Sequence, residues 1–338
     1  MGQATEKAET SGGAQMTEGM RLISWNVNGI RARWARLSEL LACERPDVVC
    51  LQETRCSDAR FPYQHLRELG YRARHSAGAE RTGGVAILVR EDHPIEDRGP
   101  ALDERREAAE GHWLELCTEG IAVGSIYVPA GAEADAAGES GKLAFLEAVA
   151  RHAYEAQSRP FLIAGDFNVA PTDQDVYEPS WFQGSYHTGD AERADLRAIL
   201  DEGELVDIYR GLHPDDSGFT CWDQREGHYG RDYGLRIDLV LASEGLAPYI
   251  TGCDVNHVYR RGYRPSDHAP LDVELCDVVG AARCMAEREP ALFYDEAEVL
   301  GEGVPAERGE EERALAERRE DERVLAERGE EERALLAA

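Results

Sequence analysis

The stretch Phe161-Leu-Ile-Ala-Gly-Asp-Phe-Asn-Val-Ala-Pro171 decides the fold. Its first four residues are apolar or small and predict a buried strand that stops at Gly165. Asp166 and Asn168 follow in alternation, and because side chains alternate with a period of two, both point the same way. Functional groups of α/β proteins collect at the carboxyl ends of strands. On this stretch alone, a functional site and a polar turn are equally good interpretations.

Apolar strands and amphipathic helices alternate with this stretch over residues 20–280. We expect further strands at 20–27, 47–51, 83–89, 113–117, 121–127, 237–242, 250–257 and 271–275. We expect helices at 31–43, 63–69, 143–154 and 193–200. Interleaved strands and helices indicate an α/β protein, and the hairpin at 113–127 makes its sheets mixed rather than wholly parallel.

The ends of the chain differ from this middle part. Residues 1–19 are small and polar and predict a disordered N-terminal extension. Residues 281–338 predict an acidic low-complexity tail, in which a ten-residue repeat starts at Ala306. Successive leucines of the repeat step back by about 80° around a helix, so they form no apolar stripe. We therefore expect a single catalytic domain over residues 20–280.

The composition is strongly acidic. The 66 Asp and Glu residues outnumber 37 Lys and Arg residues, the net charge is -29, and the only lysines are Lys7 and Lys142. An acidic, lysine-poor chain is typical of a salt-loving source, although a GC-rich genome also favours arginine. Taken alone, the acidity argues against a nucleic-acid partner, which normally requires a basic face.

No apolar run reaches the roughly 18 residues of a membrane span. The N-terminus lacks the pattern of a signal peptide, and the eight cysteines have no zinc-binding spacing. These features predict a monomeric, cytoplasmic protein with reduced thiols and no membrane partner.

Polar side chains occur at the ends of several predicted strands. Each has an ordinary explanation when taken alone: Glu53 would cap a helix, Tyr127 would lie in the core, and Ser266-Asp-His268 would form a turn. Asp238 is harder to explain in this way, because it lies among apolar residues and a buried charge needs a partner. The set is Asn26, Asn28, Glu53, Tyr127, Asp166, Asn168, Asp238 and Ser266-Asp-His268.

These residue types suit metal-assisted phosphate chemistry. Mg²⁺ prefers oxygen ligands and takes one or two carboxylates, and Glu53 and Asp267 fit that requirement. Histidine exchanges protons near neutral pH, and a buried aspartate commonly fixes its tautomer. His268 and Asp238 are therefore predicted to form a pair.

Six motifs together resemble the exonuclease III class of AP endonucleases, in the order of that family and over residues 20–276. They are Ser24-Trp-Asn-Val-Asn-Gly-Ile-Arg-Ala-Arg33, Leu51-Gln-Glu-Thr54, Gly165-Asp-Phe-Asn-Val-Ala170, Phe219-Thr-Cys-Trp-Asp223, Arg236-Ile-Asp238 and Pro265-Ser-Asp-His-Ala-Pro270. The resemblance implies a four-layer α/β sandwich, in which two mixed β-sheets pack face to face and helices flank them.

The resemblance also implies an activity. The expected reaction is Mg²⁺-dependent hydrolysis of double-stranded DNA 5′ to an abasic site, with Mn²⁺ as a substitute metal. The family often adds 3′-phosphodiesterase and 3′→5′ exonuclease activity, so 3′-blocked ends are further expected substrates.

Roles follow from the resemblance motif by motif. Asp166 orients or deprotonates the attacking water, Asn168 holds the scissile phosphate, and Tyr127 contacts the phosphate or the leaving oxygen. Asp238 orients His268, which stabilises charge on the phosphate. The implied metal-site residues are Asn26, Glu53, Asp166, Asn168, Asp267 and His268, and the implied substrate-binding residues are Asn28, Arg31, Trp222 and Leu235.

The chain departs from the family pattern at three positions. Ala130 follows Tyr127-Val-Pro129 where an amide residue is usual, which removes one phosphate contact. Leu235 replaces a tryptophan of the abasic pocket, and Asp232 replaces an amide. Trp222 remains as an aromatic wall that could cover a flipped-out sugar.

Arginines beside the motifs predict a basic rim that answers the objection from acidity, because the guanidinium group suits bidentate phosphate contacts. They are Arg31, Arg33, Arg55, Arg225, Arg231, Arg236 and Arg264. Two alternatives stay open: a phosphatase or phosphodiesterase of the same superfamily with a non-DNA substrate, and a weakly active DNA-repair scaffold that uses the repeat tail for binding. The motif Phe219-Thr-Cys-Trp-Asp223 and the complete motif set argue against both.

Overall fold

The computed structural model describes residues 19–78, 83–97, 102, 110–131, 138–182, 185–224, 227–277 and 280. All of them belong to one compact unit, Met1–Glu289. The predicted N-terminal extension, apart from Gly19, and the predicted repeat tail lie outside the described residues. No helix in the described part is long and apolar enough to cross a membrane.

The first sheet has six strands in the order β13-β14-β1-β2-β4-β3. Its first and last strands along the chain, β1 and β14, lie side by side and antiparallel, whereas β1 and β2 are parallel. The strands are β1 (Met20–Asn26), β2 (Val48–Gln52), β3 (Tyr71–Ser76), β4 (Val85–Arg90), β13 (Ile250–Val255) and β14 (Leu271–Leu275).

The second sheet also has six strands, in the order β5-β6-β7-β8-β12-β9. Here β7 and β8 are parallel, and β8 and β12 are antiparallel. The strands are β5 (Glu96–Asp97), β6 (Trp113–Thr118), β7 (Ile121–Tyr127), β8 (Phe161–Asp166), β9 (Leu205–Asp207) and β12 (Asp238–Ser243). A small third sheet pairs β10 (Cys221–Trp222) with β11 (Gly234–Leu235).

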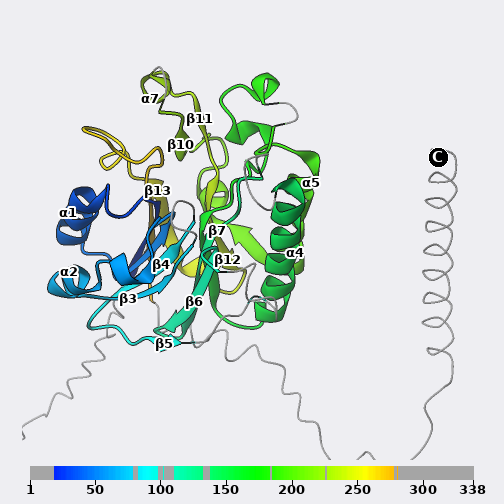
Figure 1. Cartoon of the computed structure of the whole chain (residues 1–338). Coiled ribbons are helices and arrows are strands. Elements are labelled where there is room, and N and C mark those ends of the chain that lie inside the picture. The colour runs from blue at the N-terminus through cyan, green and yellow to red at the C-terminus, as the bar shows by residue number, and fades with distance from the viewer. Residues whose placement is uncertain are drawn as a thin grey trace, which may run out of the picture. The chain divides into compact units, whose positions relative to one another are not determined.

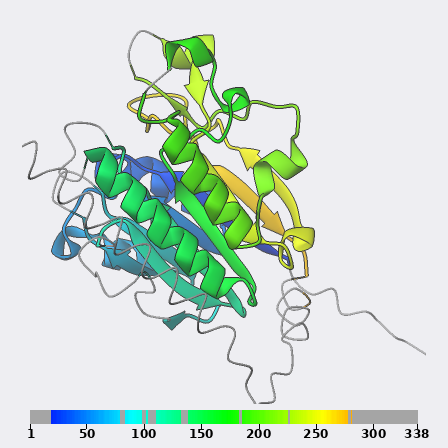
Figure 2. The ribbon, with the colours of Figure 1, turned by 90° about the vertical axis from the view of Figure 1, so that its right-hand side faces the viewer.

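Helices cover the outer faces of the two large sheets (Figures 1 and 2). The first sheet carries α1 (Trp34–Glu44) and α2 (Tyr63–Glu68), and the second carries α4 (Gly138–Ala156) and α5 (Asp190–Glu202). Short helices fill the connections: α6 (Ile208–Leu212), α7 (His228–Arg231), and the 3₁₀ turns η1 (Asp58–Arg60), η2 (Asp173–Asp175), η3 (Pro179–Trp181) and η4 (Ala247–Tyr249). The predicted four-layer sandwich of two mixed sheets is confirmed.

The period-two pattern of the strands explains the layers. In β8, Phe161 and Ile163 pack under α4 and α5, whereas Leu162 and Ala164 face the other sheet. The same alternation holds in β1, where Leu22 enters the core between the sheets. Burial of apolar surface on both faces of both sheets is the main force that holds the layers together.

Toward one end of the sandwich, the inward-facing positions change from apolar to polar. In β1 the inward series runs Leu22, Ser24, Asn26, and in β8 it runs Leu162, Ala164, Asp166. Strand β10 lies at the same end, because its Cys221 forms a β-bridge with His268. The polar ends of two facing sheets therefore meet in one place.

Candidate active site

Three buried side chains from the two sheets, those of Asn26, Asp166 and Asp238, form the centre of the site. Asp166 and Asp238 are directly opposite each other on β8 and β12, and Tyr127 lies opposite Asp166 on β7. From the facing sheet, Asn26 Nδ2 donates to Asp166 Oδ2 at 2.8 Å and to Glu53 Oε1 at 3.2 Å. One amide group therefore joins the carboxylates of the two sheets.

His268 pairs with Asp238, as the sequence predicts. Its Nδ1 lies 2.7 Å from Asp238 Oδ2, and its Nε2 lies 3.8 Å from Asp166 Oδ2. Trp25 Nε1 donates to the carbonyl of His268 at 3.2 Å, which fixes the backbone of the pair. Although burial alone would lower it, the charge of Asp238 and the hydrogen bond to it raise the pKa of His268 well above the ordinary value.

Asp166 is placed to accept a proton near neutral pH. Burial raises its pKa to about 7, with repulsion from Asp238 and Glu53 acting in the same direction, while the His268 charge and the Asn26 hydrogen bond oppose the rise. A general base is most effective when its pKa lies near the working pH. Strongly shifted groups in such a cluster favour a functional site over a merely structural one.

Asn168 and Asp267 border this centre. The backbone N–H of Asn168 donates to Asp166 Oδ1 at 2.9 Å, and its side-chain Nδ2 donates to the Val128 carbonyl at 2.7 Å. Asn28 Nδ2 donates to Asp267 Oδ1 at 2.6 Å. Burial opposes ionisation of Asp267, yet the charge of His268 and the Asn28 hydrogen bond hold its pKa below the usual value.

Three of these residues have left-handed backbone conformations, which are strained for residues other than glycine. The φ angles are 45° at Asn28, 49° at Glu53 and 51° at Asn168. Each residue follows the end of a strand. Strain of this kind persists where the surrounding structure fixes the backbone and is common at functional sites.

The side chains present fit a hard divalent cation. Glu53, Asp166, Asp238 and Asp267 bring four buried or half-buried carboxylates together, and Arg55, which ion-pairs with Glu53, and His268 are the nearby cations. Oxygens of Asp166 and Asp238 and a nitrogen of His268 lie within 4.8 Å of one another. Asp238 Oδ1 is buried without a hydrogen-bond partner among the described residues. Such an excess of carboxylate oxygens is a donor set that Mg²⁺ or Mn²⁺ accepts.

Sequence reasoning missed two residues beside the site, Lys142 and His187. Lys142 is fully buried on α4, and its Nζ donates to Glu192 Oε1 and to the carbonyl of Asn168, both at 2.8 Å, and to the Tyr186 carbonyl. His187 Nδ1 donates to the same Asn168 carbonyl at 2.9 Å, and burial lowers the pKa of His187 to about 4. The one available signal was Lys142 itself, because it is the sole lysine between residues 20 and 280.

Of the predicted substrate-binding residues, two are accessible and two are buried. Asn28 lies in the site and Arg31 is exposed. Trp222 is 1% exposed and packs against Tyr229, His257 and Arg260, so it presents no open aromatic wall. Leu235 is 8% exposed in a small apolar cluster with Ala170, Val176 and Ile237.

The predicted arginine rim is smaller than expected. Arg236 is buried and bonds to Asp175 and Asp207, so it stabilises the fold instead of lining the surface. Arg55 ion-pairs with Glu53. Arg225 lies outside the described residues.

Tyr127 stacks on His112, with ring centroids 5.5 Å apart.

Comparisons with known proteins agree with this geometry. Residues 23–268 match the model of the endonuclease/exonuclease/phosphatase family. Exodeoxyribonuclease III of Haemophilus influenzae is 32% identical over 268 residues, which cover 75% of this chain and 99% of the relative. The structure of an AP endonuclease from Archaeoglobus fulgidus is similar with a TM-score of 0.71 and 30% identity, over 76% of this chain and 99% of the other.

A 3′–5′ exonuclease from Neisseria meningitidis is similar with a TM-score of 0.69 and 30% identity, over 76% of this chain and 100% of the other. The family match includes Asn26, Glu53, Asp166, Asp238 and His268 of the site. The chain therefore belongs to the endonuclease/exonuclease/phosphatase family.

Proposed function

We propose that this protein is a metal-dependent DNA-repair nuclease that hydrolyses duplex DNA 5′ to abasic sites and removes 3′-blocking groups or 3′-terminal nucleotides. The observation that carries the proposal is the buried cluster of Asn26, Asp166, Asp238 and His268, contributed by both sheets. The relatives named above support it, since they are an exodeoxyribonuclease, an AP endonuclease and a 3′–5′ exonuclease.

In the proposed mechanism, Asp166 orients a water molecule in line with the scissile P–O3′ bond and takes up its proton. The pKa of about 7 suits that exchange. Oxygen attacks phosphorus, the P–O3′ bond breaks, and the products are a 3′-hydroxyl and a 5′-phosphate. Hydrolysis of this kind requires a positioned nucleophile and stabilisation of charge on the phosphate oxygens.

Other residues stabilise the developing charge. His268, held in one orientation by Asp238, donates from Nε2 toward a phosphate oxygen. Asn168 and Asn28 supply side-chain amides at the border of the site, and Tyr127 contacts the phosphate or the leaving oxygen. A bound Mg²⁺, held by Glu53 and Asp267 with Asn26 alongside, would supply Lewis-acid polarisation of the phosphate.

The acidic composition does not oppose this proposal, because two segments beside the site are locally basic. Residues 31–36 and 257–266 contain six arginines and no acidic residue. A local concentration of guanidinium groups can bind phosphates on a protein whose net charge is negative.

The test is a duplex with one internal tetrahydrofuran abasic analogue, incubated with Mg²⁺ or with EDTA over salt concentrations from low to molar. Incision 5′ to the analogue should occur with Mg²⁺ and stop with EDTA. Asp166→Asn should lower the rate by orders of magnitude while DNA binding is kept. The control is Asp254→Asn, which changes an exposed carboxylate away from the site. Absence of incision at every salt concentration would refute the AP endonuclease function.

A 3′-phosphate end and a recessed 3′-hydroxyl end, tested in parallel, report the 3′-repair and exonuclease activities. Failure on all three substrates would instead favour a phosphatase of the same family with a non-DNA substrate.

A further inference from the structure

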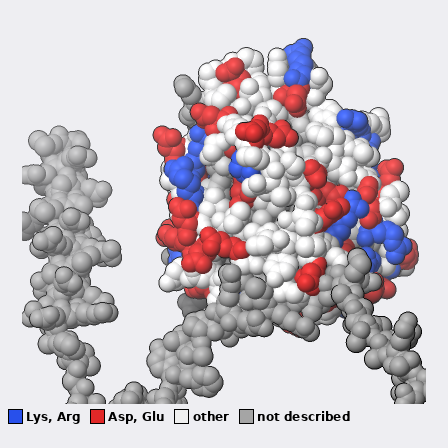
Figure 3. Space-filling model, turned by 180° about the vertical axis from the view of Figure 1, so that it is seen from behind, with Lys and Arg blue, Asp and Glu red and all other residues white. Residues whose placement is uncertain are grey.

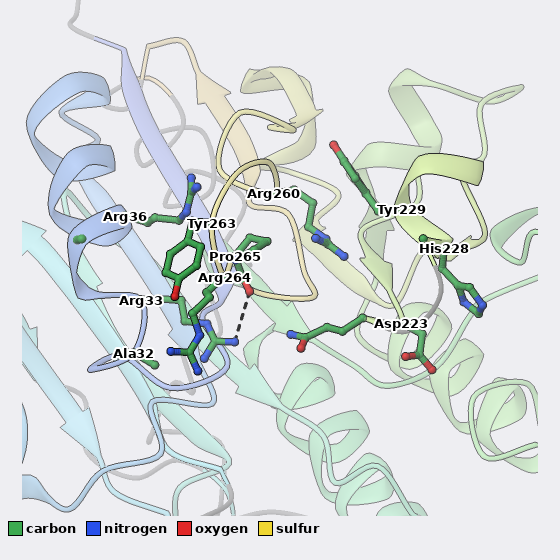
Figure 4. Close-up of a pocket in the computed structure, with 13 residues that line it drawn as sticks. Ala32, Arg33, Arg36, Asp223, His228, Tyr229, Arg260, Tyr263, Arg264 and Pro265 are labelled. Carbon is green, nitrogen blue, oxygen red and sulfur yellow. Dashed lines mark hydrogen bonds between the residues drawn. The ribbon is translucent and has the colours of Figure 1, made fainter.

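We infer that a cavity beside the active site is a subsite for an unpaired nucleotide of the substrate, with a base stacked on Tyr263 and a phosphate held by arginines. This inference rests on the proposed function. The cavity has a volume of about 690 Å³, within the range of small-ligand sites. In Figure 4, Arg33, Arg36, Tyr263 and Arg264 form one side, and Asp223, His228 and Tyr229 form the other.

The arginines of the cavity lie together without carboxylate partners. Arg33, Arg36, Arg260 and Arg264 form no ion pair with any described Asp or Glu residue. Elsewhere in the described part, Arg21, Arg90, Arg159, Arg193, Arg210 and Arg236 each pair with a carboxylate, whereas Arg45, Arg60 and Arg197 are exposed and unpaired. Acidic groups are spread over the face in Figure 3, and basic groups there form smaller patches. Unpaired guanidinium groups gathered in one cavity of an acidic protein indicate an anionic ligand.

Arg260 provides the strongest evidence that the cavity binds an anion. It is only 6% exposed, and its guanidinium lies 4.6 Å from the ring centroid of Tyr229. Its guanidinium donates hydrogen bonds to two carbonyl oxygens, those of Asp267 and Trp222. A buried cation with only neutral acceptors is costly unless an anion joins it.

The N-terminus of α1 adds to the positive potential. Ala32 and Ala35 line the cavity at this helix end, and no side chain caps it. The first N–H groups of a helix lack intrahelical acceptors and, with the helix dipole, favour a phosphate. Two independent sources of positive potential, backbone and side chain, therefore act on the same space.

Tyr263 makes the site suitable for a nucleotide and not merely for a phosphate ion. Its side chain is 84% exposed, the largest value among the exposed large hydrophobic residues of the described part. The neighbouring Gly262 has a φ of +94° and lies against the Arg36 guanidinium, where a Cβ atom would clash at 2.3 Å. Exposed aromatic rings beside arginines are typical of proteins that bind single strands, where bases stack without sequence preference.

The cavity is linked to the active site through neighbouring residues of the chain and through hydrogen bonds. Pro265 lines the cavity, and the next residue, Ser266, donates from Oγ to the Asn26 carbonyl at 2.7 Å. Arg260 Nε donates to the carbonyl of Asp267, a proposed metal-site residue. A strand whose scissile phosphate lies at Asp166 and His268 therefore has its neighbouring nucleotides within reach of the cavity.

The experiment measures equilibrium binding of the full chain to fluorescein-labelled DNA in EDTA, so that no cleavage occurs. The probes are a blunt duplex and the same duplex with a short single-stranded 5′ or 3′ extension. One of the extensions should tighten binding about tenfold, as expected for one stacked base. Tyr263→Ala should remove this gain and Tyr263→Phe should keep it. Tyr154→Ala, which removes an exposed tyrosine of α4, should leave the gain unchanged.

Equal affinity of the wild-type protein for all three probes would overturn the inference, as would a gain that survives Tyr263→Ala. Incision of an internal abasic analogue in a long duplex by the wild-type protein tests the proposed function separately. Incision without an extension-dependent gain would remove the subsite and leave the nuclease function standing.

Discussion

Replacement of Lys142 by methionine should destabilise the protein strongly, although Lys142 makes no proposed contact with the substrate. Its ammonium group is fully buried and forms an ion pair with the buried carboxylate of Glu192 at 2.8 Å. Removing one partner of a buried pair leaves the other charge uncompensated and costs about 3–5 kcal/mol. For a domain of this size, the midpoint of thermal unfolding should fall by about 6–20 °C.

Urea denaturation at neutral pH measures the free energy of unfolding of each variant. The matched control is Arg151→Met, which breaks an exposed ion pair with Glu147 on the same helix and should cost less than about 1 kcal/mol. The double variant Lys142→Met/Glu192→Leu should recover part of the loss, because it removes both charges. A Lys142→Met variant no less stable than the Arg151→Met control would refute this reasoning.

Three further predictions concern the site, pH and the tail. Asp238→Asn should lower kcat about 10²–10⁴-fold with little change in the Kd for DNA, because His268 loses the charged acceptor that fixes its tautomer and stabilises its protonated form. An unchanged kcat would contradict a catalytic role of the pair. Burial opposes ionisation of Asp175, but the charge and hydrogen bonding of Arg236 hold the pKa of Asp175 below its usual value. The ionised Asp175 therefore stabilises the folded protein fully above the ordinary carboxyl pKa of about 3.9. This stabilisation is lost as the pH falls through the lower pKa of the folded state. In Asp175→Asn, the free energy of unfolding should therefore fall less steeply as the pH is lowered into the acid range. An unchanged pH dependence would show that other carboxylates control acid stability. Deletion of residues 306–338 should leave kcat/KM for incision unchanged, and a large loss would show that the tail takes part in the reaction.

The architecture could be predicted because strand periodicity is a local signal. The apolar residues of 161–164 and their alternation define both faces of β8, and the other strands repeat the pattern. The predicted boundaries differ mainly at helix ends: α1 begins at Trp34 and not at Arg31. Fraying and alternative turns at a helix end depend on a few weak interactions that the sequence does not rank.

The centre of the site could be predicted because its residues are the terminal residues of buried strands, where the sheet determines their positions. Asn26, Asp166 and Asp238 are of this kind. The contacts of Lys142 and His187 with Asn168 could not be predicted, because they depend on how the chain after β8 packs against the start of α4. The roles of all these residues stay predictions until variants are measured.

The prediction for Trp222 illustrates a second limit. Its motif position is consistent with a wall of the abasic pocket, yet Tyr229 and Arg260 cover the indole, and Asp232 accepts a hydrogen bond from its Nε1 at 3.1 Å. Exposure of a single aromatic ring depends on long-range packing, which local sequence pattern does not contain.

The antiparallel pairing of β1 with β14 has a consequence for the newly made protein. Asn26 comes from the start of the domain and His268 from its end, and contacts such as Trp25 with His268 join residues 243 positions apart. While the ribosome is still holding residues 266–268, the carboxylates of β8 lack their histidine and the first strand lacks its neighbour. The site is therefore complete only after the whole domain has been translated.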